Sequence, residues 1–154
     1  MTTTTENLAA FHGKVSVKKK FLKRVREHQA NDKLVQGYGY WSDGKGCAVG
    51  CTLERNEGDD ESGVHGLYPE QLGLPTWLAH LEDHIFEALP KEKAQQWPER
   101  FLAAIKTGQS IPDAVRDQFQ VWWLDQNLAE LDAEKAGEQI AAIENIQSLL
   151  RDSI

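Results

Sequence analysis

The sequence predicts an all-α protein, built as a single orthogonal bundle of five or six helices. Over most of the 154 residues, apolar side chains recur every three or four positions, the spacing along one helix face. Prolines and glycines stand at the boundaries of these segments. A glycine-rich stretch is the exception, and a small β-hairpin is expected there, near residues 36–52. We expect one helical domain over residues 13–154, after a flexible N-terminal lead over residues 1–12.

The first helix is expected over residues 16–30. Ser16 suits the N-cap position, where a hydroxyl accepts a hydrogen bond from a free backbone N–H group. Lysines and arginines fill the positions between the apolar ones, so the exposed side of this helix is basic. The helical spacing is carried by Val17, Phe21, Leu22, Val25 and His28.

The middle of the chain is less regular. Glycines over residues 37–46 end the helical pattern. Residues 47–54 can form a short helix or a buried strand, because periodicity cannot decide over so short a run. The following segment, RNEGDDESG over residues 55–63, is expected to be a polar loop whose acidic side chains could meet a basic surface.

Four more helices are expected in the second half. Pro75, Pro98 and Pro112 each suit the first position of a helix, where the missing N–H group costs no hydrogen bond. The third of these helices carries a broad apolar face, made of Val115, Phe119, Trp122, Trp123, Leu128 and Leu131. The expected helices cover residues 75–88, 98–108, 112–131 and 138–151.

The orientation of helix 75–88 decides what its two histidines can do. At about 100° per residue, one side of the helix collects most of the large apolar residues. That buried side is expected to hold Trp77, Leu81, Ile85 and Ala88. His80, Asp83 and Glu87 fall on the opposite side, so we expect His80 to be solvated and His84 to lie at the boundary.

Charge divides the chain unevenly. The net charge is −7, but residues 1–40 carry eight basic and three acidic residues, whereas residues 41–154 sum to −12. The two regions can steer different partners or neutralise each other in the folded protein. No apolar run reaches the ~20 residues that cross a bilayer, and no signal peptide is evident at the N-terminus. We therefore expect no membrane partner and a cytoplasmic protein with reduced cysteines.

Both cysteines lie in the segment GKGCAVGC, and three interpretations of them stay open. Cys47 and Cys51 could bind zinc with His65, although C-x-x-C spacing is absent, so no metal or other cofactor is expected. Cys47 could be a catalytic thiol with His65 as base and Glu54 or Asp83 as its orienting acid. The favoured interpretation is a buried packing segment, because free cysteines and small residues suit close contacts.

The same region offers a recognition surface. Tyr38, Tyr40 and Trp41 are rigid aromatic groups on a glycine-rich backbone, and Lys45 adds a positive charge beside them. These side chains could stack on single-stranded nucleic acid, but the acidic body would repel phosphate groups. A protein partner is therefore preferred.

Several segments together resemble a family of uncharacterised proteins found in bacteria and their phages. The resemblance rests on the motifs GYGYW, GKGCAVGCTL, LAHLEDHIFEALP and WPERFLAAI, within about residues 35–105. It implies no assigned activity, but it directs interest to Gly46, Cys47, Gly50, Cys51 and His65. Distribution among phages would suit a host-interaction or counter-defence protein.

Two hypotheses of function follow from the sequence. The preferred one is a small non-enzymatic binding protein that engages a macromolecular partner through the aromatic, glycine-rich loop and charged surfaces. The alternative is a thiol-dependent or zinc-dependent hydrolase or transferase centred on Cys47, Cys51 and His65.

Overall fold

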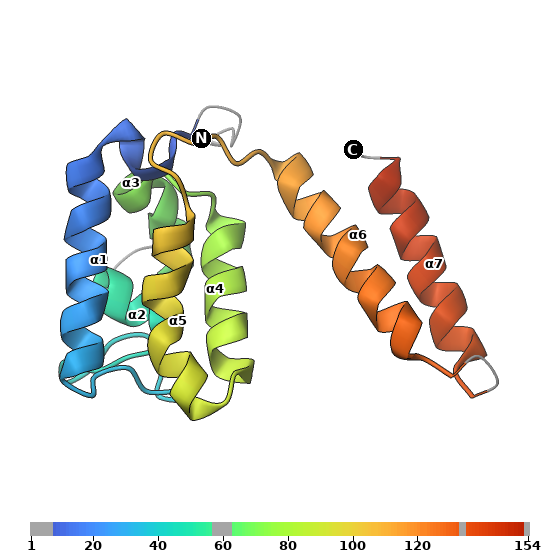
Figure 1. Ribbon diagram of the computed structural model, residues 1–154, viewed down its shortest axis with the longest axis horizontal. Helices are drawn as coiled ribbons and strands as arrows, with labels where there is room; N and C mark the ends of the chain where they lie inside the picture. The colour runs from blue at the N-terminus through green and yellow to red at the C-terminus, as the bar shows by residue number, and fades with distance from the viewer. Residues whose placement is uncertain (1–7, 57–62, 133–134, 153–154) are drawn as a thin grey trace. The chain divides into compact units, whose positions relative to one another are not determined.

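A computed structural model of the chain describes residues 8–56, 63–132 and 135–152 (Figure 1). These residues form α-helices, short 3₁₀ turns and loops, with no strand among them, so the predicted all-α class is confirmed. The 3₁₀ turns that matter below are η2 (Ala10–Gly13) and η4 (His65–Leu67). The α-helices are α1 (Val15–Ala30), α2 (Ala48–Leu53), α3 (Tyr68–Leu72), α4 (Thr76–Ala88), α5 (Lys91–Ala104), α6 (Asp113–Glu130) and α7 (Gly137–Arg151).

The helices group into two compact units, an N-terminal unit (Met1–Ile111) and a C-terminal unit (Pro112–Ile154). The domain expected over residues 13–154 therefore comprises two units, and each is described by itself. In the N-terminal unit, α5 contacts both α1 and α4, and the short helix α2 packs against the same three helices (Figure 1). In the C-terminal unit, α6 and α7 pack against each other as a helical hairpin.

The hydrophobic core belongs to the N-terminal unit. Every buried hydrophobic side chain among the described residues lies between Ala10 and Ile111. The core also includes part of the expected flexible lead. Residues 1–7 lie outside the described residues, whereas Ala10 and Phe11 are buried, and backbone hydrogen bonds join Ala10 to Gly108 and Gln109.

Most expected helices have their expected bounds, but α5 begins earlier than Pro98. Pro90 takes the N-cap position, and its carbonyl accepts the N–H groups of Lys93 and Ala94. Pro98 instead lies inside α5 and is buried. A proline in a helix interior removes one backbone hydrogen bond, and here its ring contributes to the buried face. The pattern of prolines in the sequence cannot tell these two positions apart.

The segment over residues 36–52 is a loop that leads into a helix. Its only paired turn among the described residues is Ser42 to Lys45, where each backbone N–H donates to the other residue's carbonyl at 2.9 Å. Asp43 and Gly44 both have positive φ, the conformation of a tight hairpin turn. The expected hairpin is thus reduced to one turn, and the segment left undecided between helix and strand forms α2.

Helix α4 is rotated relative to the expectation. The expected inward residues Trp77, Leu81 and Ile85 are only half-buried, and the fourth, Ala88, is exposed. The buried side instead holds Leu78, Ala79, Glu82 and Phe86. The sequence pattern failed here because Glu82 is fully buried, and a helical wheel assigns an acidic residue to the exposed side.

Candidate functional site

The glycines of GKGCAVGC allow the preceding loop to lie directly on α2. A Cβ atom at Gly46 would stand 1.7 Å from the Tyr40 carbonyl oxygen, and one at Gly50 would stand 1.4 Å from the same atom. Only glycine permits such an approach of two backbones. This contact fixes the backbone of Tyr40 and so determines where its side chain can point.

Both thiols lie inside this packing arrangement. Cys47 is the N-cap of α2, and its sulfur accepts the N–H of Gly50 at 3.4 Å. Burial, and then the negative charge of Asp83, raise the pKa of the Cys47 thiol well above its usual range. Burial raises the pKa of Cys51 to about 12. Both groups are therefore neutral thiols near pH 7, a form that is a poor nucleophile and a poor metal ligand.

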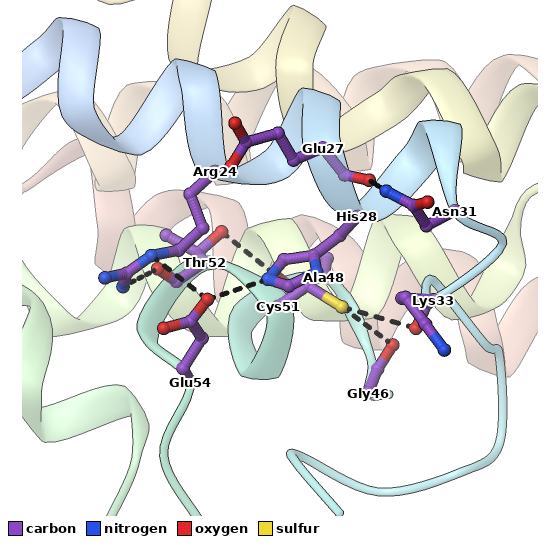
Figure 2. A network of polar contacts seen from close by, with 10 residues as sticks. All are labelled: Arg24, Glu27, His28, Asn31, Lys33, Gly46, Ala48, Cys51, Thr52 and Glu54. Atoms are coloured by element: carbon purple, nitrogen blue, oxygen red, sulfur yellow. Dashed lines mark hydrogen bonds and ion pairs between the residues drawn. The ribbon is translucent and has the colours of Figure 1, made fainter. Parts of the chain in front are cut away.

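A polar network joins α2 to the basic helix α1 (Figure 2). Arg24 donates to the carbonyl of Thr52 at 2.8 Å and pairs with Glu54 at 3.4 Å. His28 Nε2 lies 2.9 Å from the same Glu54 carboxylate, and the Cys51 thiol donates to the carbonyl of Gly46. These contacts stabilise the end of α2 and use Glu54, which the sequence offered as a partner of His65.

Other cations of α1 also find partners within the N-terminal unit. Lys18 donates to the carbonyl of Ala103 at 2.8 Å, at the end of α5 where a positive charge is favourable. Arg26 pairs with Glu99 at 2.6 Å. Part of the basic side predicted for this helix is therefore paired within the N-terminal unit rather than presented to a partner.

Among the predicted site residues, His65 makes the most extensive contacts with polar and aromatic side chains. Its Nε2 atom lies 3.2 Å from Asp83 Oδ2, and its Nδ1 atom lies 3.3 Å from the Tyr40 hydroxyl. The His65 ring stacks on His80 with centroids 4.0 Å apart and meets the edge of Tyr40 at 5.1 Å. His65 thus joins Asp83, one of the two acids considered for it.

These residues line an open pocket on the N-terminal unit. Tyr40 comes from the glycine-rich loop, His65 from η4, and the other lining residues come from α4. Burial and the neighbouring His65 lower the pKa of His80. The complete lining is Tyr40, His65, His80, Asp83, His84, Glu87 and Ala88.

The four residues predicted to form a binding surface divide into two groups. Tyr38 and Lys45 are exposed. Tyr40 and Trp41 are half-buried, because Tyr40 reaches His65 and Trp41 packs on His28 with ring centroids 5.0 Å apart. Two of the three aromatic groups therefore serve the fold of the N-terminal unit.

The largest exposed apolar side chains of the described residues lie in the C-terminal unit, where the sequence predicted no site. Trp122 is 55% exposed and Trp123 is 52% exposed, and we call these two residues the tryptophan pair. Val115, Ile146 and Leu149 are also exposed. The sequence did contain a signal for this surface, namely the breadth of the apolar face of α6. The face is too broad for all of its apolar side chains to pack against α7.

Polar contacts hold the interior of this hairpin. Gln147 is buried and donates to Asp125 Oδ1 at 2.6 Å. Asp117, also buried, accepts a hydrogen bond at 2.8 Å from its neighbour Arg116 in the same helix, so this second contact does not join α6 to α7. The described part of this unit contains no fully buried hydrophobic side chain.

Comparisons with protein-family models, with curated proteins and with solved structures find no match to this chain. The family resemblance stated above therefore stays a prediction. Within the described ranges, no group of three or more His, Cys, Asp or Glu side chains is arranged to hold a metal ion. A search of the same residues finds no helix with the length and apolar character needed to span a membrane.

Proposed function

We propose that this chain is a non-enzymatic binding protein that recognises a protein partner through the tryptophan pair on α6. The observation that carries the proposal is the exposure of two adjacent tryptophans, 55% and 52%. Tryptophan is enriched among the residues that dominate binding energy at interfaces. Large exposed apolar groups on a soluble domain typically mark such interfaces.

The spacing on α6 suits insertion into a groove. Val115, Phe119 and Trp122 are separated by four and three residues, so they form a row along one helix face. The rings of Phe119 and Trp122 contact each other with centroids 5.7 Å apart. Amphipathic helices that bind apolar grooves use anchors with this spacing.

Charge favours a basic partner. Residues 112–154 carry nine acidic and three basic residues, a net charge of −6. An apolar groove rimmed by lysine or arginine would complement this surface, whereas nucleic acid or a second copy of the same acidic hairpin would be repelled. The proposed partner is therefore a protein with a basic, apolar surface.

The burial of both thiols supports a binding role over the alternative of a thiol-dependent or zinc-dependent enzyme. Cys47 and Cys51 are buried and their pKa values are raised. Activation of a catalytic thiol needs the opposite, a pKa lowered toward neutrality and access for the substrate. His65 is engaged by Asp83 and Tyr40 rather than by either thiol.

The direct test is partner capture followed by reconstitution. The partner would be captured on immobilised full-length protein, identified by mass spectrometry, and purified so that the dissociation constant can be measured. Replacing both Trp122 and Trp123 by alanine should weaken binding by about a hundredfold or more, because the interface would lose two anchors. Circular dichroism would check that the variant keeps its helices.

Tyr38→Ala is the matched control, since it removes an exposed aromatic side chain from the glycine-rich loop. The proposal predicts a small effect of this change. Unchanged affinity of the variant with both tryptophans replaced, together with a large loss of affinity for Tyr38→Ala, would show that the glycine-rich loop is the binding surface instead. The identity of the captured protein would also test the expected cytoplasmic setting and the host-interaction role of a phage protein.

A further inference from the structure

The pocket around His65 has a defined construction that the proposed function does not use. Its walls are aromatic or imidazole rings held against one another: Tyr40 meets His65 edge-on at 5.1 Å, and His65 stacks on His80 at 4.0 Å. Hydrogen bonds to both ring nitrogens fix His65 in place. The tight contact of Tyr40 with Gly46 and Gly50 holds the loop wall rigid. Such a site is organised before any ligand arrives.

The permanent charges of the pocket are negative. Asp83 and Glu87 line it, and no lysine or arginine of the described residues does. Asp83 pairs with His65 through Oδ2 at 3.2 Å, and its other oxygen, Oδ1, is buried. Glu87 is exposed, and one of its oxygens accepts the N–H of Gly37 at 2.8 Å. The pocket should therefore attract cations and repel anions.

The geometry discriminates between kinds of cation. Because no three ligating side chains in the described chain are arranged around one point, a metal ion would lack a ready coordination shell. A planar organic cation would instead meet the rings that line the pocket and the carboxylate of Glu87, which can receive its N–H groups. Guanidinium has this combination of flat shape, permanent charge and several donors.

We infer that the pocket of Tyr40, His65, His80, Asp83 and Glu87 binds a guanidinium group. The plane of the group would lie against the imidazole and phenol rings of the lining, and its N–H groups would donate to Glu87, while the nearby charge of Asp83 adds to the attraction. The group could belong to an arginine side chain of a protein or to a free guanidino compound. The two sources share this chemistry and are separated by the experiment below.

The test follows the histidine ring signals of the full-length protein by NMR during titration. Nα-acetyl-arginine methylamide should shift the signals of His65 and His80 with a millimolar dissociation constant. The citrulline analogue, which is neutral and nearly the same shape, should cause no shift at equal concentration. A peptide with one central arginine should bind more tightly than the blocked amino acid if the source is a protein, and equally if the source is a small molecule.

Two substitutions localise the binding. Glu87→Gln removes one pocket charge while keeping an acceptor for Gly37, and should weaken arginine binding about threefold to fivefold, as expected for an exposed charge pair. Glu92→Gln makes the same change at an exposed position of α5 outside the pocket and should leave binding unchanged. The double alanine variant of the tryptophan pair should also bind arginine normally. The test of the pocket and the test of the proposed function can therefore fail independently of each other.

Three results would overturn the inference. The first is the absence of any shift of the histidine signals by the arginine probe. The second is an equal shift by the citrulline probe, which would show that charge is not recognised. The third is a shift by zinc at stoichiometric concentration without a response to arginine, which would make the pocket a metal site.

Discussion

At the scale of single residues, Glu82 is the most unusual side chain of the fold. It is fully buried, accepts a hydrogen bond from the Tyr68 hydroxyl, and leaves Oε1 without a partner among the described residues. Burial raises the pKa of Glu82 to about 8. The carboxyl group is therefore protonated at neutral pH, because the charged form would be poorly solvated in the core.

This protonation makes stability depend on pH. The folded pKa lies above the ordinary value of 4.5, so the stabilising contribution is complete below pH 4.5 and is lost as pH rises toward 8. Within that interval, this group should lower the free energy of unfolding by about 1.4 kcal/mol per pH unit. Urea unfolding of the wild type and of Glu82→Gln at pH 5, 6, 7 and 8 measures the difference. Equal slopes for the two proteins would show that Glu82 is not protonated in the fold.

Gly50 should be intolerant of substitution. A Cβ atom there would overlap the Tyr40 carbonyl at 1.4 Å, so Gly50→Ala should lower the free energy of unfolding by about 3 kcal/mol or more. Gly137, at the start of α7, is the matched control because a Cβ atom there meets nothing within 4 Å. Gly137→Ala should be neutral or stabilising by about 0.5–1 kcal/mol. Comparable destabilisation by both changes, measured by urea unfolding, would refute the close backbone contact.

Part of the site was predictable at this scale. The sequence indicated that Cys47 and Cys51 belong to a packing segment, and both are buried. It also paired His65 with Asp83 as one of two options. Neither the contact of Gly46 and Gly50 with Tyr40 nor the burial of Glu82 was predictable, because residue spacing does not specify the path of a loop or the side chains that surround a helix.

At the scale of elements, α2 shows why short segments resist prediction. Its six residues are too few for periodicity, and its stability comes from tertiary contacts with α1 rather than from helix propensity. Helix α4 shows a different failure. Its length was predicted correctly, but the predicted buried face was wrong because helical-wheel reasoning places an acidic residue such as Glu82 on the exposed side. Helix bounds follow local signals, whereas the choice of the inward face depends on the partners that surround the helix.

The packing of α2 predicts inert thiols. Cys47 and Cys51 are buried in the element and their pKa values are raised, so iodoacetamide at pH 7.5 should label them at least about a hundredfold more slowly than in the unfolded protein. Mass spectrometry of labelled peptides at timed intervals provides the rates. Rapid labelling of Cys47 alone in the native protein would instead support the hypothesis that Cys47 is a catalytic thiol.

At the scale of the whole molecule, the two units differ in how they are stabilised. The N-terminal unit contains all the buried hydrophobic side chains of the described residues, and the C-terminal unit is held by the contact of two helices and by polar groups. A helical hairpin of this size is marginal without further burial. This asymmetry was not evident from the sequence, where both units show helical periodicity and the C-terminal unit has the larger share of apolar residues.

A chain ending at Ile111 should therefore fold on its own. It retains the complete core, so it should unfold cooperatively in urea and give dispersed amide signals. A peptide of residues 112–154 should have low helicity by circular dichroism, because its helices lack a buried core. Loss of cooperative unfolding in the shorter chain would mean that the core needs the C-terminal unit.

The central claim is that the tryptophan pair, rather than a thiol, carries the function. The most direct test compares the dissociation constant of the captured and purified partner for wild type, Cys47→Ser and the double alanine variant of Trp122 and Trp123. We predict wild-type affinity for Cys47→Ser and a loss of about a hundredfold or more for the tryptophan variant. Full affinity of the tryptophan variant for the partner, together with a large loss of affinity in Cys47→Ser, would contradict the claim and favour the thiol-dependent alternative.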